Sequence, residues 1–204
     1  MASSFDARAQ TWDDQPGRRQ MAAELFAALE RAVPLRPDMA VLDYGAGTGL
    51  LALALAPRVR RVLAVDSSAG MLEVLGRKAR AASLAQVETL QADFSRDPLP
   101  PGPFDLAASA MTLHHVADPD RLFRKFFALL APGGQLALAD LDTEDGSFHG
   151  ANAAGVHHRG FDRGALARQL AAAGFAGIRF ADAARLEKNG RAYTVFLAVA
   201  RRPG

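Results

Sequence analysis

The sequence predicts an α/β fold in which strands and helices alternate along a chain of 204 residues. Short apolar runs of strand length alternate with longer segments whose apolar residues recur at helical spacing. A glycine-rich turn joins the first strand to the helix after it, and four successive strands end in polar or small residues. Because open α/β sheets bind ligands at the carboxyl ends of their strands, we expect a ligand site at that edge.

The amino-terminal part of the chain is expected to form a polar arm followed by a helix. Residues 1–16 are mostly polar, with Phe5 and Trp12 lying among acidic residues. A helix is predicted from about Arg18 to Val33, and the prolines after it end it. Its apolar residues have helical spacing: Met21, Leu25, Phe26 and Leu29.

The first strand leads into the segment Val-Leu-Asp-Tyr-Gly-Ala-Gly-Thr-Gly at residues 41–49, and a helix follows from about Thr48 to Ala56. Gly45 and Gly47 lack side chains where a ligand has to approach the backbone closely. Asp43 stands at the lip of this turn. A carboxylate there does not favour a pyrophosphate, whereas it suits a ligand that carries an ammonium and a sulfonium. The alternative, that Asp43 is a polar residue at a strand end without a ligand, stays open.

The glycine spacing also departs from the fingerprint of dinucleotide-binding folds. That fingerprint has a third glycine or alanine three residues after the second glycine, where this chain has Leu50. The third glycine comes earlier, at Gly49. A Gly-x-Gly-x-Gly turn is a weak signal by itself, so its meaning depends on the strands that follow.

The second predicted strand, Arg61 to Val65, ends in Asp66. This acid lies about 20 positions beyond Gly45, where nucleoside-binding α/β folds place the residue that binds the ribose hydroxyls. Ser67 and Ser68 follow as candidate caps of the next helix.

The third and fourth predicted strands end in residues that suit an adenine. The strand at residues 86–91 is followed by Ala92, Asp93 and Phe94. A carboxylate can accept a hydrogen bond from the exocyclic amine of adenine, and an aromatic ring can cover its face. The strand at residues 104–109 ends in the small residue Ser109.

The remaining elements continue the alternation and then end in a hairpin. Helices are predicted from about Asp118 to Leu130 and from Asp162 to Gly174. Strands are predicted from Gly133-Gly134 to about Leu141, near Ile178–Ala183 and near Tyr193–Arg201. Residues 185–192 are predicted as the turn between the last two strands.

The chain resembles the class I S-adenosylmethionine-dependent methyltransferases over nearly its whole length. The segments that carry the resemblance are VLDYGAGTG (41–49), VLAVDSSAGML (62–72), QADF (91–94), FDLAASAMTLHHV (104–116) and LLAPGGQLALAD (129–140). The resemblance implies one methyltransferase domain over residues 1–204. It also implies a doubly wound, mostly parallel seven-stranded sheet with helices on both faces and a C-terminal antiparallel hairpin.

The resemblance also implies S-adenosylmethionine as the cofactor and a set of residues that bind it. Residues 1–33 would fold over the cofactor. The residues implied for the methionine part are Asp43, Tyr44, Gly45, Ala46 and Gly47. Those implied for the nucleoside are Asp66, Ser67, Met71, Ala92, Asp93 and Phe94, and Ser109 and Trp12 complete the set.

Several of these residues also have an ordinary structural interpretation. Met71 has the helical spacing of a core residue, and Phe94 can be core as well. Ser109 can simply leave space, and Trp12 can anchor the terminal arm.

All five histidines lie in two places, after the fourth and the fifth predicted strands. Methyl transfer needs a base only when the acceptor has to lose a proton, and histidine is the obvious candidate. We expect His114 to be the first choice and His158 the second, with His115 pointing elsewhere. Residues 142–161 form a long loop, which favours a substrate lid.

The loop also holds oxygen and nitrogen atoms that a divalent ion could bind. None of its histidines has the spacing of a preformed helical pair, so we expect no metal.

Composition bounds the function classes. The chain has no cysteine, which excludes disulfides and zinc–thiolate sites, and its net charge is only +2. Its arginines are scattered, which argues against a nucleic-acid substrate. No apolar signal core or membrane span is evident, so the expectation is a cytoplasmic protein with a small-molecule methyl acceptor. The oligomeric state is left open.

The sequence is compatible with three functions. The first is a methyltransferase for a small acceptor. The second is a non-catalytic module that binds S-adenosylmethionine or S-adenosylhomocysteine and acts through a partner. The third, a nicotinamide-dependent oxidoreductase, is disfavoured by Asp43 and Leu50.

Overall fold

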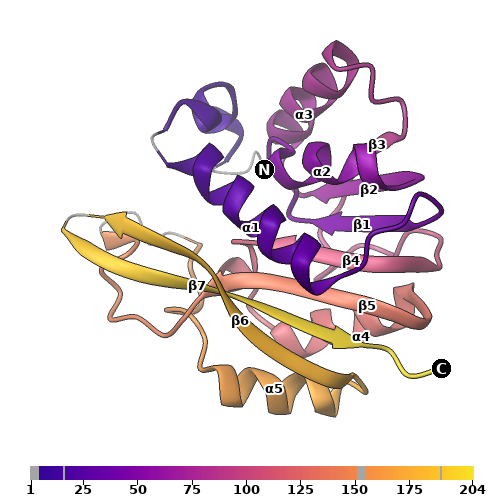
Figure 1. Cartoon of the computed structure of the whole chain (residues 1–204). Helices are drawn as coiled ribbons and strands as arrows, with labels where there is room; N and C mark the ends of the chain where they lie inside the picture. Colours follow the sequence, from indigo (N-terminus) through magenta and orange to yellow (C-terminus); the bar gives the residue numbers. More distant parts are fainter. Residues whose placement is uncertain (1–4, 16, 151–154, 189) are drawn as a thin grey trace.

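The computed structural model describes residues 5–15, 17–150, 155–188 and 190–204. Their strands form one seven-stranded sheet with the order β3-β2-β1-β4-β5-β7-β6 (Figure 1). The strands are β1 (Ala40–Tyr44), β2 (Arg61–Asp66), β3 (Val87–Gln91), β4 (Phe104–Ala110), β5 (Leu130–Leu141), β6 (Ala176–Lys188) and β7 (Arg191–Arg201). Strands β1 to β5 are parallel, and β7 is antiparallel to both of its neighbours. The predicted fold class is therefore confirmed, hairpin included.

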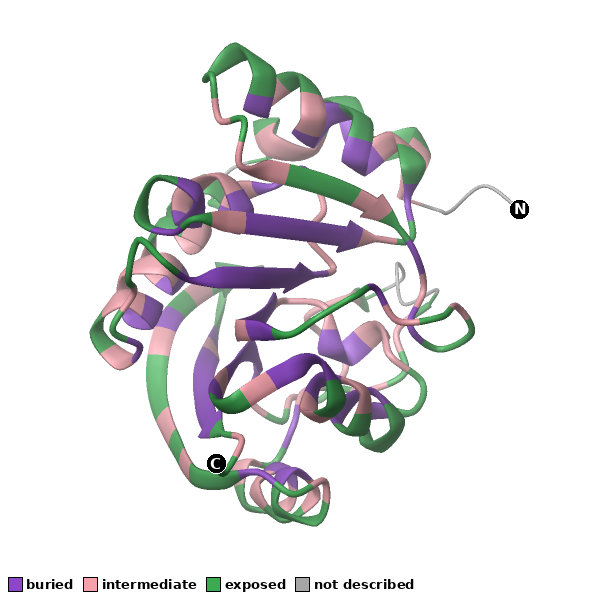
Figure 2. Ribbon diagram, turned by 90° about the vertical axis from the view of Figure 1, so that its right-hand side faces the viewer, coloured by how far each residue is buried: buried purple, intermediate pink, exposed green. Residues whose placement is uncertain are grey.

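Helices cover both faces of the sheet (Figure 1). The helices are α1 (Arg18–Ala32), α2 (Leu50–Leu55), α3 (Ala69–Ala81), α4 (Pro119–Leu129) and α5 (Arg163–Ala172), with shorter turns η1 (Asp6–Asp14), η2 (Ala56–Arg58) and η3 (Leu113–His115). One apolar cluster joins α1, α2 and α3 to the sheet, and a second joins α4 and α5 to it. Figure 2 shows the consequence: the central strands are buried, whereas the edge strand β3 is largely exposed.

Three of the helices begin at a side chain that caps the first turn. Ser68, Asp118 and Asp162 each accept a hydrogen bond from the backbone N–H three residues ahead, at the start of α3, α4 and α5. The serine that caps α3 is Ser68, which is fully buried, while Ser67 is exposed.

Two elements differ in extent from the prediction. Helix α2 is only six residues long, because the chain tightens into η2 after Leu55. The final hairpin is longer, with pairing that continues to Lys188 and Arg191. Strand β6 lies at the edge of the sheet beside β7, and many of its residues are exposed and polar. A search for apolar runs therefore underestimates its length.

The amino-terminal arm is ordered from Phe5 to Gln15 and contains the helical turn η1, which was not predicted. Two carboxylates attach it to the rest of the molecule. Asp6 accepts hydrogen bonds from Ser68 Oγ and Gly70 N, and Asp13 bonds Thr48 Oγ1 and Lys78 Nζ. These contacts connect residues more than 30 positions apart, which local sequence patterns do not reveal.

Candidate functional site

The glycine turn after β1 is built from three glycines with positive φ, and only one of them faces open space. A Cβ on Gly45 would lie 2.2 Å from Thr112 Oγ1, and a Cβ on Gly49 would lie 2.4 Å from Leu75 Cγ. A Cβ on Gly47 would meet nothing within 4 Å. Gly45 and Gly49 therefore allow close packing inside the protein, and Gly47 is the one that leaves room for a ligand.

The backbone N–H groups of the turn are already used. The amides of Gly45 and Ala46 both donate to Val65 O, at 2.8 and 3.0 Å. The amide of Gly47 donates to Asp66 Oδ2, and that of Gly49 donates to Ala46 O. A pyrophosphate needs several free N–H donors at such a turn, so this turn does not suit one.

Asp43 has the electrostatic environment of a cation site. Its side chain is 1% exposed, and its Oδ2 has no hydrogen-bond partner among the described residues. Burial, followed by the nearby charge of Asp66, raises the pKa of Asp43 to about 7. A buried acceptor without a partner is costly, so a positively charged group beside Asp43 would be strongly favoured. The ammonium and sulfonium of S-adenosylmethionine fit this requirement.

Asp66 lies at the end of β2, next to the turn. Its Oδ1 accepts from Ser68 N and its Oδ2 from Gly47 N, both at 2.8 Å. Burial raises its pKa, against the opposing effect of these hydrogen bonds. An ionised carboxylate has about four acceptor positions, so Asp66 can hold the turn and still accept two ribose hydroxyls.

The residues predicted to frame the adenine lie together but are partly engaged by the protein. Ala92 is buried and its N–H donates to Asp66 O. The carboxylate of Asp93 bonds Arg96 Nε and Ser95 N. Phe94 is 1% exposed and its ring packs 4.8 Å from that of Tyr44, inside the core.

Three other predicted residues also have clear structural partners. Ser109 Oγ donates to Tyr44 O. Met71 is buried in a small cluster with Ala9 and Val74, against which Phe5 and Trp12 pack. This places Trp12 in the contact that anchors η1, with the guanidinium of Arg18 3.4 Å from the centre of its ring.

Three of the five histidines come together. The ring centroids of His114 and His115 are 4.2 Å apart, and His149 lies 4.9 Å from His114 and 5.8 Å from His115. That His115 points elsewhere if His114 faces the pocket stays a prediction; in the η3 turn the two rings lie in contact, tilted by 45°. His158 is separate: its Nε2 bonds Val116 O and its ring packs on Phe161.

Burial favours the uncharged forms of His115 and His149, the two histidines that lie against His114. Burial, and then the neighbouring His114, lowers the pKa of His115. The same two effects together with His115 lower the pKa of His149 to about 4. Both rings are therefore neutral near pH 7.

The sequence did not point to Asp140, which is fully buried in β5 and bonds His114 Nδ1 at 2.7 Å. A signal was present. An aspartate in an otherwise apolar strand needs a partner, and the histidine pair at the end of the adjacent strand β4 could supply one.

The segment 142–161 was predicted to be a substrate lid, and its residues 151–154 lie outside the described part of the chain. The described part is attached to η3: His157 N and His158 N both donate to His114 O, and His115 Nδ1 bonds Gly155 O. On its other side Ser147 Oγ bonds Tyr193 of β7. The segment thus lies between η3 and the hairpin and brings His149 to His114.

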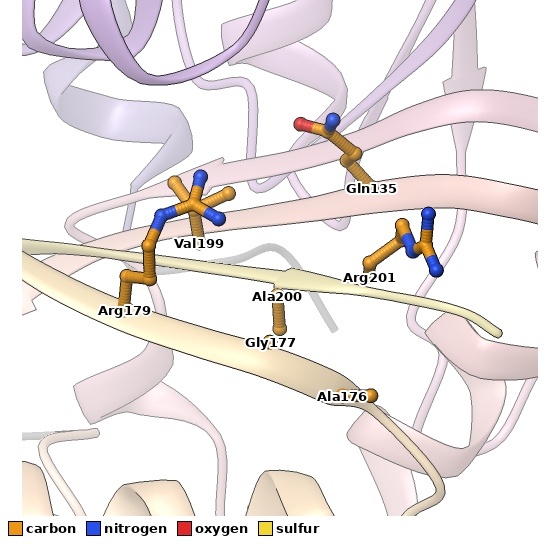
Figure 3. A pocket seen from close by; sticks show the side chains of 7 residues that line it. All are labelled: Gln135, Ala176, Gly177, Arg179, Val199, Ala200 and Arg201. Atoms are coloured by element: carbon orange, nitrogen blue, oxygen red, sulfur yellow. The ribbon is translucent and has the colours of Figure 1, made fainter.

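The remaining surface features lie elsewhere. A cavity of about 300 Å³, drawn in Figure 3, is lined by residues of β5, β6 and β7 that include Gln135 and Arg201. Gln135 pairs with Arg201, whereas the carboxyl end of β5 is at Leu141, so this cavity is remote from the glycine turn. In the described ranges, no three His, Asp or Glu side chains are grouped to hold a metal ion, and no helix is long and apolar enough to cross a membrane.

Comparisons with known proteins identify the family to which the chain is similar. A family model described as "Methyltransferase domain" matches residues 18–179. An uncharacterized methyltransferase of Geobacillus kaustophilus is 33% identical over 150 residues, 71% of this chain and 65% of that protein. The demethylmenaquinone methyltransferase of Thermus thermophilus is 37% identical over 124 residues, 60% of this chain and 53% of that protein. The chain thus spans less than two thirds of the length of these relatives.

A solved structure shares the fold. It is the phosphoethanolamine N-methyltransferase 2 of Haemonchus contortus, in complex with phosphomonomethylethanolamine and S-adenosylhomocysteine. The TM-score is 0.75 at 19% identity, covering 89% of this chain and 53% of that one.

Proposed function

The chain belongs to the class I S-adenosylmethionine-dependent methyltransferases, and we propose that it transfers the methyl group to a small-molecule acceptor by in-line displacement. The observation that carries the proposal is the buried Asp43 carboxylate, whose Oδ2 lacks a partner among the described residues. Bound S-adenosylmethionine would supply an electrophilic methyl group on a sulfonium. The protein then has to bind the two ends of the cofactor and align the acceptor.

We assign the cofactor-binding roles as follows. Asp43 binds the positively charged methionine part beside the open face of Gly47, and Asp66 accepts the ribose hydroxyls. Asp93 is assigned to the adenine, for which its carboxylate has to share its acceptor capacity with Arg96. Ala92 and Phe94 form the apolar floor beside it.

A small acceptor is supported by two features. No inserted domain separates β1 from β5, and one sheet joins the described strands, which favours a single catalytic domain over residues 1–204. The Thermus relative and the Haemonchus neighbour carry names that refer to small-molecule acceptors. We propose that this chain also acts on a small molecule.

We propose His114 as the base rather than His158. His114 lies on η3 directly after the strand that reaches the glycine turn, and its ring is held by Asp140. The ring of His158 instead attaches residues 155–161 to Val116. The segment 142–161 is proposed to cover the acceptor.

Calorimetric titration with S-adenosylmethionine, S-adenosylhomocysteine and NADH, run in parallel on the purified chain, tests the cofactor. Micromolar binding of the two sulfur nucleosides and none of NADH is expected. In Asp66→Ala, two charge-assisted hydrogen bonds to the ribose are lost, each worth about 1.5–3 kcal/mol, so affinity should fall by at least about a hundredfold. Glu88→Gln, on the exposed strand β3, is the matched control and should bind normally.

Two outcomes would contradict the proposal in different ways. Failure of a folded protein to bind either sulfur nucleoside would remove the cofactor assignment. Binding without methyl transfer to any member of a broad acceptor panel would favour the non-catalytic binding module instead.

A further inference from the structure

We infer that the methyl acceptor carries a weakly acidic hydroxyl group, and that Asp140 positions His114 to remove the proton of that hydroxyl. The inference rests on the proposed function, because it concerns the acceptor side of the same site. It is drawn from the hydrogen bonds of Asp140 and from the polar atoms around the histidine cluster (His114, His115 and His149).

Asp140 is held in one position by three N–H groups. Its Oδ1 bonds His114 Nδ1 and Leu141 N, both at 2.7 Å, and its Oδ2 accepts from His114 N at 3.2 Å. Its side chain is fully buried and that of His114 is 2% exposed. Because a carboxylate can only accept, His114 carries a hydrogen on Nδ1, so in the neutral tautomer of the ring the lone pair lies on Nε2.

The backbone before His114 fixes where this ring lies. Met111 has a φ of +54°, which is strained for a side chain of its size, and its N–H donates to Ala139 O. The next residue, Thr112, packs on Gly45 and bonds its carbonyl oxygen. The His114 segment is therefore built directly against the glycine turn, which is the turn assigned to the methionine part of the cofactor.

The loop that brings His149 to His114 carries two buried polar atoms without hydrogen-bond partners among the described residues. They are Nε2 of His149 and Oε1 of Glu144. Both residues belong to the loop after β5, and the charge of Glu144 acts on His149. Each such atom is costly when it stays unpaired, so a ligand that supplies hydrogen bonds here would be favoured.

The charged and titratable groups in and around the histidine cluster come from five elements. Asp140 contributes from β5, His115 from η3, and Glu144 and His149 from the loop after β5. Arg8 of η1 lies close enough to His115 to affect its charge, and Lys188 of β6 lies close enough to affect His149. The rings of His115 and His149 meet edge to face with centroids 5.8 Å apart, and Phe5 and Phe148 pack against them, so the surroundings of His114 are aromatic.

A hydroxyl acceptor is the type that needs this arrangement most. An uncharged amine already has a nucleophilic lone pair, and a thiol ionises readily, whereas a phenolic or enolic hydroxyl needs a base during transfer. In the proposed step the hydroxyl proton moves to Nε2 of His114. An oxygen lone pair forms the new O–C bond to the methyl carbon, the C–S bond breaks, and its electron pair stays on sulfur as a neutral thioether.

The first test uses 4-nitrophenol, whose absorption differs between its neutral and ionised forms. The protein is saturated with S-adenosylhomocysteine and titrated with the probe about one pH unit below the probe's own pKa. The wild type should bind the probe in its ionised form. His114→Gln should lose the ionised signal, and Asp140→Asn should need a pH about one unit or more higher to reach the same ionised fraction. Glu88→Gln, on the exposed edge strand β3, should behave as wild type.

A second measurement asks whether Asp140 acts through the tautomer of His114 or only through stability. The ring nitrogens of ¹⁵N-labelled histidine should report a hydrogen on Nδ1 of His114 in the wild type and a mixture of tautomers in Asp140→Asn. Transfer of a labelled methyl group is then compared for 4-nitrophenol, 4-nitroaniline and 4-nitrothiophenol, which share one ring. Label should reach the hydroxyl compound only, and Asp140→Asn should lower kcat with little change in KM.

Each contrary outcome overturns the inference. These outcomes are binding of the phenol only in its neutral form, preferential labelling of the amine or thiol, or no binding of any phenol by a protein that binds S-adenosylhomocysteine. Binding of S-adenosylhomocysteine is measured in the same sample. If that binding also fails, the proposed function fails with it, so the two failures are distinguishable.

Discussion

At the scale of single residues, the three glycines of the turn show that one sequence pattern serves two physical needs. Gly45 and Gly49 leave no space for a Cβ because of their neighbours Thr112 and Leu75, whereas a Cβ on Gly47 would meet no described atom within 4 Å. The motif alone predicts ligand contact for Gly45 and Gly47. Of these two, the structure leaves open space at Gly47, to which we assign the contact.

This difference predicts opposite phenotypes for two alanine substitutions. Gly47→Ala should cost about 1–2 kcal/mol of stability, because a Cβ is strained at positive φ, but it should strongly weaken S-adenosylmethionine binding. Gly49→Ala adds a clash with Leu75 and should lower the melting temperature much more. Thermal unfolding and calorimetry of both variants check this. Equal melting temperatures would contradict the distinction.

Asp43 predicts how cofactor binding depends on pH. The pKa of this carboxyl is about 7 in the free protein, and an ammonium ligand binds its ionised form. Binding should therefore release a proton, and affinity should fall as pH drops below about 7, approaching about tenfold per pH unit. Calorimetry in buffers of different ionisation enthalpy measures the released proton directly.

Asp43→Asn is the matched control for this effect. It removes the titrating group but keeps the shape of the side chain, so its affinity should be weaker and should no longer change with pH through Asp43. If the variant keeps the pH dependence of the wild type, another group is responsible.

The role of a residue could be predicted from the sequence where a motif fixes its position. It could not be predicted where the role depends on a contact between residues far apart in the chain. Asp43 and Asp66 were identifiable because each follows an apolar strand at a known spacing. Asp140 occupies a similar position at the end of β5, but its partner lies on η3, 26 positions away. Only the fold shows that the two side chains meet.

At the scale of elements, η1 and the residue before it contact both the histidine cluster and the glycine turn. Phe5 packs on His115 with ring centroids 5.3 Å apart, and Asp13 bonds Thr48 of the glycine turn and Lys78 of α3. Lys78 Nζ also donates to Thr48 O. The segment therefore connects the acceptor side of the site to the cofactor side.

Asp13→Asn should loosen this connection and speed the release of cofactor. The ion pair with Lys78 is partly buried, and losing it with its hydrogen bond should cost about 0.5–1.5 kcal/mol, which corresponds to roughly a two- to tenfold faster dissociation. Stopped-flow release of S-adenosylhomocysteine measures the rate. Glu88→Gln removes the exposed ion pair with Arg61 and should leave the rate unchanged, and an unchanged rate in Asp13→Asn would contradict the role of η1.

Buried strands were predicted more accurately from the sequence than the exposed strand at the sheet edge. Strands β1, β2 and β4 are nearly all buried apolar residues, so hydropathy located them within a residue or two. Strand β6 alternates irregularly between exposed and half-buried positions because it lies at the sheet edge, and its length was underestimated. Its order in the sheet came from family resemblance rather than from any local pattern.

At the scale of the whole molecule, the site contributes two opposite terms to the pH dependence of stability. His149 has a folded pKa of about 4, below its unfolded value, so the unfolded chain binds the extra proton first and stability falls as pH drops from about 6.5 to 4. Asp43 has a folded pKa of about 7, above its unfolded value, so the folded chain holds the extra proton and stability rises as pH drops from about 7 to 4.

Single substitutions should separate these two terms. The melting temperature of His149→Gln is compared with that of the wild type at pH 5 and at pH 8. The difference should favour the variant more at pH 5, because the variant lacks the group that destabilises the wild type in acid. Asp43→Asn should show the reverse, with its largest advantage at pH 8, where the wild type has to hold an unpaired buried charge. Saturating S-adenosylmethionine should cancel the advantage of Asp43→Asn, since the bound ammonium pairs with the charge. If the cofactor stabilises both proteins equally at pH 8, Asp43 does not face the cofactor, and the cation site has to be sought elsewhere at this edge of the sheet.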